Sequence, residues 1–309
     1  MKVLITGGAG FIGSNIADVL IKKGHVVVVL DNLSSGKKEN INKQAGFYKI
    51  DVFDKKAVKD VFNKEKPQIV IHNAAQIDVR KSVADPFFDA EVNILGSINV
   101  LNSCVENRVK KIIFASSGGT IYGECNNSAP NEESKINPMS PYGIAKNSVE
   151  NYIKFYSAVH GLSYIILRYG NVYGPRQDPH GEAGVIAIFA AKMLKNEEIM
   201  VFGDGKQMRD YVYVADVVNA NLKALIKGKN QIINIGTSKA LSINELVRVM
   251  SKISGYSKKA IYKPKRDGEL FKSFVNISKA KKLLSWEPKF NIESGIKETI
   301  KYFKNVVNL

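Results

Sequence analysis

The chain has 309 residues, 45% of them hydrophobic and 24% charged, which is typical of a globular protein and excludes a disordered or collagen-like chain. The formal net charge is +16, but the basic residues are scattered and lack interleaved aromatics, so we expect no nucleic-acid partner. Cys104 and Cys125 have no neighbour at metal-binding or redox spacing, which predicts no metal site and a cytoplasmic location. The apolar stretch at the first residues is too short for a signal peptide or a membrane span, so we expect no membrane partner.

The first half of the chain alternates short β-branched runs with helix-length amphipathic segments. This pattern predicts an α/β fold with a doubly wound parallel sheet that helices cover on both faces. The run 26–30 is apolar throughout, as in a strand buried on both faces. The predicted strands are residues 2–6, 26–30, 47–50, 69–72, 111–115 and 163–168, and the predicted helices are 12–23, 55–63, 87–107 and 142–159.

After about residue 171 the pattern loosens into shorter elements. We predict a helix over 184–196, a strand over 199–202 and helices over 214–226, 243–253 and 292–304. The length of the chain exceeds that of one typical domain. We therefore expect a sheet domain over residues 1–170 and a smaller mixed substrate lobe over 171–309, part of which returns to the first domain.

A glycine-rich turn follows the first predicted strand and opens the first predicted helix, in the sequence Thr6-Gly7-Gly8-Ala9-Gly10-Phe11-Ile12-Gly13. Glycines allow a tight turn and a close approach of the backbone to a pyrophosphate, whose charge the helix N-terminus stabilises. Such a turn alone is weak evidence, but Asp31 ends the second predicted strand, where the dinucleotide-binding (Rossmann) fold places an acid on the ribose diol. A carboxylate there repels a 2′-phosphate, so we predict NAD rather than NADP. The alternative is that Asp31 caps the turn that follows it.

Further candidates for the cofactor site follow other predicted strands. Asp51 ends the third strand and suits a contact to the adenine amine, although a plain loop aspartate is nearly as plausible. The small residues of Asn73-Ala74-Ala75, after the fourth strand, would let a flat cofactor lie across the strand ends. Asn93 either bonds to a nearby loop or contacts the cofactor through water, and the sequence favours neither interpretation.

Tyr142 and Lys146 are four residues apart on a predicted helix, which places them on one face as neighbours. A tyrosine with its ordinary pKa near ~10 is a poor base at neutral pH. An adjacent ammonium favours the phenolate, as does the positive charge of an oxidised nicotinamide. The pair therefore predicts an acid/base tyrosine, the alternative being a solvated aromatic with a lysine stem packed on it.

With further motifs, these residues make nearly the whole chain resemble the extended short-chain dehydrogenase/reductases, and within them the nucleotide-sugar epimerases of the UDP-glucose 4-epimerase group. The motifs that carry the resemblance are the glycine turn, Asp31-Asn32-Leu33, His72-Asn73-Ala74-Ala75, Ser116-Ser117-Gly118-Gly119-Thr120-Ile121-Tyr122-Gly123, Pro141-Tyr142-Gly143-Ile144-Ala145-Lys146, Arg168-Tyr169-Gly170-Asn171-Val172-Tyr173-Gly174-Pro175-Arg176 and Arg209-Asp210-Tyr211-Val212.

The resemblance implies an NAD-dependent UDP-hexose 4-epimerase. Tyr142 would take the proton of the sugar C4 hydroxyl while C4 gives a hydride to NAD, and the 4-keto sugar would turn and take the hydride back on its other face. Lys146 would bond to the nicotinamide ribose. A homodimer is also implied, through a four-helix bundle that contains the helices predicted over 87–107 and 142–159.

One position departs from the family pattern. The family usually has Ser or Thr four residues before the tyrosine of the loop, to bond the C4 oxygen, and this chain has Gly118 there. Thr120 and Ser117 are the candidates to replace it, or a water, although both hydroxyls could merely cap the strand end. Similar 4,6-dehydratases carry an Asp-Glu pair in this loop, so Gly118-Gly119 argues against elimination of water.

The resemblance implies two further sets of residues. The candidate cofactor-binding residues are Gly7, Gly10, Phe11, Ile12, Gly13, Asp31, Asn32, Ser34, Ser35, Gly36, Asp51, Val52, Asn73, Ala74, Ala75, Asn93, Ser116, Tyr142, Lys146, Tyr169 and Val172. The candidate UDP-sugar residues are Asn171, Val185, Val201, Phe202, Arg209, Arg266, Glu269 and Ser273.

Within the second set, Asn171 and the two arginines would meet the diphosphate and sugar, for which a planar guanidinium is suited. Val201 and Phe202 would lie near the uracil and Glu269 on the nucleotide ribose. Taken alone, each arginine is more commonly a surface salt bridge. Ser273 aligns with the position that sets the room around the sugar C2 substituent, and its small size predicts that N-acetylhexosamine nucleotides are accepted.

Two other functions remain as alternatives. One is an epimerase or decarboxylase of UDP-glucuronate with a similar fold. The other is a non-catalytic NAD-sensing regulator, because a fold alone does not determine function. The presence of both Tyr142 and Lys146 argues against the regulator.

Overall fold

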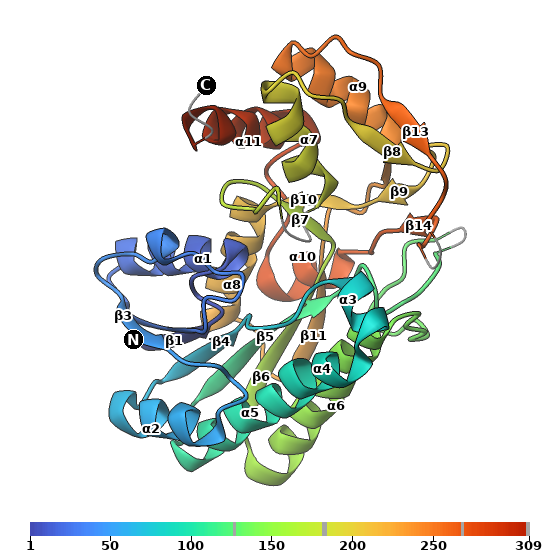
Figure 1. The fold of residues 1–309 in the computed structure, drawn as a ribbon. Coiled ribbons are helices and arrows are strands. Elements are labelled where there is room, and N and C mark those ends of the chain that lie inside the picture. The colour runs from blue at the N-terminus through green and yellow to red at the C-terminus, as the bar shows by residue number, and fades with distance from the viewer. Residues whose placement is uncertain (126–127, 181–183, 267–268, 307–309) are drawn as a thin grey trace.

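The computed structural model describes residues 1–125, 128–180, 184–266 and 269–306. Its centre is a seven-stranded sheet in the order β11-β6-β5-β4-β1-β2-β3, in which every neighbouring pair is parallel (Figure 1). The strands are β1 (Lys2–Thr6), β2 (Val26–Asp31), β3 (Gly46–Lys49), β4 (Ile69–His72), β5 (Lys111–Ser117), β6 (Ser163–Tyr169) and β11 (Gln231–Ile235). The predicted doubly wound parallel sheet is confirmed.

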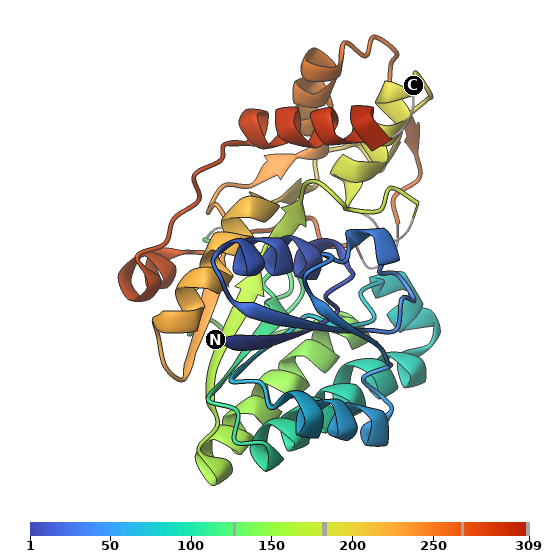
Figure 2. The same cartoon turned by 90° about the vertical axis from the view of Figure 1, so that its left-hand side faces the viewer.

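Alternate side chains of the strands enter two separate hydrophobic cores. In β1, Val3 and Ile5 belong to one core and Leu4 to the other. Because both faces of the sheet are buried, its strands are apolar at nearly every position. Figures 1 and 2 show α1 and α8 on one face and α2, α5 and α6 on the other. The bounds are α1 (Phe11–Lys22), α2 (Lys55–Glu65), α5 (Gly96–Glu106), α6 (Pro141–His160) and α8 (Val214–Ile226).

The single helix predicted over 87–107 is interrupted in the structure. The chain forms α3 (Val79–Ala84), then α4 (Pro86–Ala90), and passes through η2 (Glu91–Leu95), a turn of π-helix, before α5 begins. The wide turn contains Asn93, whose buried side chain donates to the backbone oxygen of Gln76 at 3.0 Å. Turns of this kind are frequent at functional sites.

The last strand of the sheet, β11, is one that the sequence pattern does not predict. It pairs with β6 from Gln231↔Ile165 to Ile235↔Tyr169. The segment is short and lies between polar loops, and its Ile233 and Ile235 are buried in the hydrophobic core of the folded protein. Together α8 and β11 bring residues 214–235 of the later chain back to the first part of the molecule.

The rest of the later chain forms a mixed lobe above the carboxyl ends of the strands (Figure 1). Its small sheets have the orders β10-β7, β12-β9-β14 and β13-β8. Its elements are β7 (Asn171–Tyr173), α7 (Val185–Leu194), β8 (Met200–Phe202), β9 (Met208–Arg209), β10 (Tyr211–Tyr213), β12 (Leu241–Ser242), α9 (Ile243–Ser254), β13 (Ile261–Lys263), β14 (Lys272–Ser273) and α11 (Ile292–Val306). The remaining helix, α10 (Ser278–Leu284), packs against α8 and β11. Across the described ranges, no helix combines the length and the apolar composition that crossing a bilayer requires.

Candidate active site

The glycine turn lies between β1 and α1, against the loop that follows β4. Gly7 has φ +67°, and its N–H donates to the Leu30 oxygen at 2.9 Å. A Cβ on Gly7 would lie 2.7 Å from the Ala74 nitrogen, and one on Gly13 would collide with the Gly7 oxygen. No side chain caps the first turn of α1, which follows Gly10, so its N–H groups can bind phosphate oxygens.

Asp31 lies beside this turn at the end of β2. Its Oδ2 accepts from the Ala9 N–H at 2.9 Å and its Oδ1 from the Leu33 N–H at 2.8 Å. A carboxylate has about four acceptor sites, so two remain for a ribose diol. Asp31 therefore holds the following loop, as the alternative interpretation supposed, and keeps acceptor capacity for a ligand.

The loop after β2 is joined to the end of β3. Asn32 Nδ2 donates to Asp51 Oδ2 at 2.8 Å, and the Phe53 N–H donates to Asp51 Oδ1 at 2.9 Å. Asp51 thus organises this rim, while Ser34 and Ser35 are exposed. Gly36 approaches Asp31 so closely that a Cβ would lie 2.8 Å from Oδ1, and Val52 is buried where Gly96 packs against it.

The Asn73 side chain, after β4, has the clearest need of a ligand. Its Oδ1 and Nδ2 are both buried and have no hydrogen-bond partner, although the backbone N–H of Asn73 donates to the Thr6 oxygen at 3.1 Å. Buried polar atoms of native proteins are nearly always paired. Next to it, Ala74 packs against Gly7, and Ala75 is partly buried. A dinucleotide on the glycine turn would supply the missing partners, so these residues fit NAD.

The side chain of Asn93 forms hydrogen bonds with the loop after β4. Its Oδ1 accepts from the Gln76 N–H at 3.0 Å, and its Nδ2 donates to the Gln76 oxygen and to Asp89 Oδ1. Both amide hydrogens are therefore used within the protein. Of the two interpretations that the sequence left open, the structure shows the bond to the loop.

A buried polar chain that the sequence did not indicate lies beneath this loop. The Ala74 N–H donates to Thr6 Oγ1, which lies 2.6 Å from His72 Nδ1, while His72 Nε2 lies 2.9 Å from Ser97 Oγ. Because Ser97 Oγ donates to the Asn93 oxygen, it accepts from Nε2–H, and His72 Nδ1 accepts from Thr6. Burial lowers the pKa of His72 to about 3, so the ring is neutral. The hydrogen bonds with Ser97 and Thr6 place its proton on Nε2.

Tyr142 and Lys146 lie in the first turns of α6, which begins with Pro141 after the N-cap Ser140. Lys146 Nζ donates to the Ala115 oxygen at 3.0 Å and lies 5.6 Å from the centre of the Tyr142 ring. The lysine is 4% exposed, and burial lowers its pKa to about 8. The ammonium and the tyrosine therefore meet in a place of low solvent access, where charge acts strongly.

The loop after β5 explains the unusual glycine at position 118. A Cβ on Gly118 would lie 2.7 Å from Val275 Cγ1 and 3.2 Å from the Arg168 oxygen. A side chain there would enter the packed core, so the structure accounts for glycine at this position. Thr120 Oγ1 is buried without a partner, which leaves it available for a ligand.

Gly119 brings residues of both lobes together. The position of its absent Cβ lies 3.6 Å from Asn171 Oδ1, 3.8 Å from Ser117 Oγ and 3.9 Å from Ser273 Oγ. Ser273 Oγ also donates to the Gly119 oxygen at 3.1 Å. The structure thus places a candidate catalytic hydroxyl beside two candidate substrate residues that are distant in sequence.

Two candidate cofactor residues direct their hydroxyls elsewhere. Ser116 Oγ donates to Glu150 Oε1 at 2.6 Å, and Tyr169 OH accepts from Asn221 Nδ2 at 2.8 Å. Both hydroxyl groups are therefore already hydrogen-bonded within the protein. Val172, in β7, packs against the hydrophobic core.

The candidate nucleotide residues lie in the mixed lobe. Arg209 Nη2 lies 3.3 Å from Glu269 Oε1, and the Arg266 guanidinium lies 3.7 Å from the centre of the Phe202 ring. Val201 is buried in the core, so only its backbone could meet a base. Val185 is the first residue of α7.

Tyr211 belongs to the motif Arg209-Asp210-Tyr211-Val212, but the sequence does not predict it as a site residue. Its hydroxyl is buried without a partner, and burial raises its pKa. Arg209 and Glu269 also act on the hydroxyl electrostatically. Its position two residues after Arg209, on the same side of an extended segment, is the signal that could have found it.

Comparison with known proteins defines the class to which this fold and site belong. Residues 3–236 match the model of the NAD-dependent epimerase/dehydratase family, and the chain belongs to that family. Among the described residues, no cluster of three or more His, Cys, Asp or Glu side chains could hold a metal ion.

Within this family, three similar proteins are UDP-glucose 4-epimerases. A UDP-glucose 4-epimerase of Thermotoga maritima, solved with UDP-glucose, is 49% identical with a TM-score of 0.98, over 99% of this chain and 100% of that one. A UDP-glucose 4-epimerase of Thermus thermophilus, solved with NAD, is 42% identical with a TM-score of 0.94, over 98% of this chain and 99% of that one. A UDP-glucose 4-epimerase of Mycolicibacterium smegmatis is 39% identical over 99% of each chain.

Proposed function

We propose that this chain is an NAD-dependent UDP-hexose 4-epimerase that interconverts UDP-glucose and UDP-galactose, a step of galactose metabolism. The observation that carries the proposal is the pairing of Tyr142 with the buried ammonium of Lys146. The first turn of α6 packs against the loop of Ser117 and Thr120, since a Cβ on Gly143 would lie 3.0 Å from the Thr120 oxygen. The likeness over the whole length to enzymes solved with UDP-glucose and with NAD supports it.

In this proposal NAD supplies a reversible acceptor for the hydride of the sugar C4. Tyr142 takes the proton of the C4 hydroxyl and returns it to the 4-keto sugar, and the Lys146 ammonium favours the phenolate that this requires. A hydroxyl of Ser117 or Thr120 donates to the C4 oxygen. Arg209 and Arg266 hold the diphosphate, because guanidinium groups bind phosphate oxygens in pairs and stay charged.

Incubation with a panel of UDP-sugars, without added cofactor, tests the proposed reaction. We expect the C4 epimer to form from UDP-glucose and from UDP-galactose. Because Ser273 is small, we also expect interconversion of UDP-N-acetylglucosamine and UDP-N-acetylgalactosamine. Protein that is shown to contain NAD and forms no epimer would refute the proposal. Turnover of UDP-glucuronate alone would instead favour a uronic-acid epimerase or decarboxylase.

We predict that NADP binds at least about tenfold more weakly than NAD, because the Asp31 carboxylate repels a 2′-phosphate. Fluorescence titration of cofactor-free protein measures both affinities. The Asp31→Asn variant keeps an acceptor oxygen and loses the charge, so its preference for NAD should shrink. Asp51→Asn, which changes the carboxylate after the next strand, should keep the preference. Equal affinity of the wild-type protein for the two cofactors would contradict the prediction.

We predict that the double variant Ser117→Ala/Thr120→Ala lowers kcat by about 10²-fold, because no hydroxyl then stabilises the C4 oxygen as its charge develops. The single variants should show which hydroxyl acts. Ser148→Ala, on α6, is the control and should leave kcat unchanged. Wild-type turnover by the double variant would show that a water or another group serves the C4 oxygen.

We also propose a homodimer in the cytoplasm. The outer face of α6 exposes a row of large apolar side chains, Ile144, Tyr152, Phe155 and Val159, as monomers rarely do. The cysteines Cys104 and Cys125 are both free and buried, which suits a reducing compartment. Sedimentation velocity tests the oligomeric state, and a monomer at micromolar concentration would oppose the dimer.

A further inference from the structure

The Lys146 ammonium is buried. Three titratable groups around it interact with it electrostatically. Asp89 comes from α4, which packs against α6, Glu150 lies one turn further along α6 itself, and His72 comes from β4. Lys146 Nζ donates a hydrogen bond to the Ala115 oxygen, which carries no charge. An ammonium in such a place stays charged only if a negative charge compensates for the lost water.

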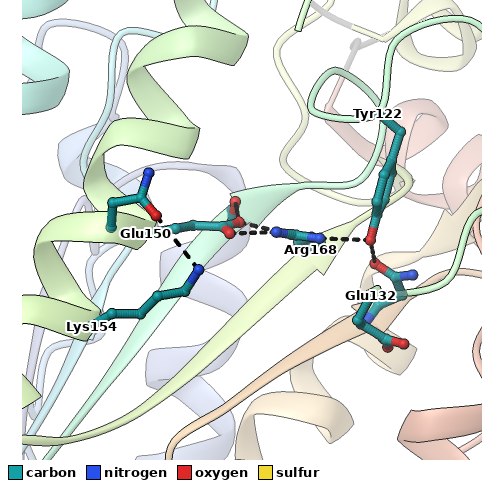
Figure 3. Close-up of polar contacts among 8 residues, drawn as sticks. Tyr122, Glu132, Glu150, Lys154 and Arg168 are labelled. Atoms are coloured by element: carbon teal, nitrogen blue, oxygen red, sulfur yellow. Dashed lines mark hydrogen bonds and ion pairs between the residues drawn. The ribbon is translucent and has the colours of Figure 1, made fainter. Parts of the chain in front are cut away.

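Glu150 also favours the charged form of Lys146, but less than Asp89 does, and it is already engaged in an ion pair with Arg168. Glu150 Oε1 accepts from Arg168 Nε at 2.9 Å and Oε2 from Nη2 at 2.6 Å, and both residues are at most 1% exposed (Figure 3). Arg168 Nη1 donates to Tyr122 OH at 2.8 Å, which keeps the guanidinium in place. Because its charge is shared with Arg168 in this way, Glu150 is the weaker of the two carboxylates that stabilise the Lys146 ammonium.

Asp89 is held quite differently. It is 1% exposed, and its Oδ1 accepts from Gln76 Nε2 and from Asn93 Nδ2, each at 2.9 Å. Both donors are neutral amides, and within the described ranges Asp89 forms no ion pair. The amides orient the carboxylate and favour its charged form, while burial raises its pKa.

The other charged groups around α6 do not change this balance. Burial keeps His72 neutral. Arg80 and Lys81 of α3 are exposed, and Arg80 pairs with Asp78 at 3.1 Å. Glu91 of η2 is partly exposed, so water screens its charge.

We propose that Asp89 is the main counter-charge that keeps the Lys146 ammonium charged while Tyr142 transfers its proton. Asp89 is a positioning residue, because it acts through Lys146 and has no proposed contact with substrate or cofactor. The π-helical turn η2 contributes to this arrangement, because it contains Asn93, which bonds both to Asp89 and to the loop after β4. The inference rests on the proposed roles of Tyr142 and Lys146.

The Asp89→Asn variant tests the proposal, because it keeps one acceptor oxygen for the two amides and removes the negative charge. Without the carboxylate, Lys146 loses its proton at lower pH. The alkaline limb of the kcat profile should therefore move down by about one pH unit, with KM little changed. Asp89→Glu, which restores a charge, should recover the limb at least in part, and Glu91→Gln is the control and should keep the wild-type profile.

A second measurement does not depend on activity. The ¹³Cε resonance of Lys146, identified by its absence in Lys146→Met, is titrated in wild-type and Asp89→Asn protein, and its midpoint should fall by about one unit. Failure of the epimerase assay would leave this titration valid. If Asp89→Asn does not fold, Asp89→Ser provides the same comparison. An unchanged kcat profile and an unchanged Lys146 midpoint in a folded neutral variant would overturn the proposal.

Discussion

The Tyr142→Phe variant is expected to retain NAD and to lose about 10²- to 10⁴-fold in kcat, the usual contribution of a positioned acid/base group. The ring still fills its place at the start of α6, so the loss would come from the hydroxyl alone. Product formation from UDP-galactose measures the rate, and absorbance of the cofactor released on denaturation measures the NAD content.

Tyr152→Phe is the matched control, because it removes a hydroxyl further along the same helix, where the side chain is 41% exposed. It should turn over like the wild-type protein. A Tyr142→Phe variant with full NAD content and undiminished kcat would remove Tyr142 from the proposed mechanism.

The Gly13→Ala variant is expected to be purified without NAD and to unfold at lower temperature. Its new Cβ would meet the Gly7 oxygen and lie 2.9 Å from Gly8 Cα, so α1 would have to move away from the glycine turn. Overpacking of this kind costs about 1–3 kcal/mol, and the displaced first turn of α1 would lose its hold on the pyrophosphate. Cofactor content and thermal unfolding report the two effects.

Gly46→Ala, in β3, is the control for the general cost of adding a methyl group. Its Cβ would lie 3.7 Å from the nearest atom, Val28 Cγ2, which is an ordinary van der Waals contact. This variant should keep its NAD. Normal NAD content in Gly13→Ala would mean that the close packing of α1 on the turn is not required for the cofactor.

The parts of the site that the sequence predicted are those within one short segment. The i and i+4 spacing of Tyr142 and Lys146 places them together on any helix, and the structure has them on α6. The glycine turn and Asp31 could likewise be predicted, because each directly follows a strand that its apolar run reveals. Such features depend on local geometry and need no knowledge of the partners of a strand.

The parts that the sequence missed depend on contacts between distant segments. In the sequence, Gly118 occupies the position where the family usually has Ser or Thr. In the structure, Val275 packs where a side chain at position 118 would lie. The unpartnered hydroxyl of Tyr211 and the buried ion pair of Glu150 with Arg168 likewise depend on contacts between distant elements. No pattern along the sequence predicts which side chains of distant segments contact each other in the core.

Periodicity and spacing, which act over a few residues, determined the parallel sheet and the tyrosine and lysine of the proposed chemistry, and the resemblance of the sequence motifs to a known family indicated the class of the protein. Only the tertiary structure decided how charge is distributed around Lys146. The packing of α4 on α6 brings Asp89 near the ammonium, and the pairing of β6 with its neighbours buries Arg168 against Glu150. The physical reason is burial. A charged group that is removed from water keeps its charged form only where the fold places an opposite charge beside it.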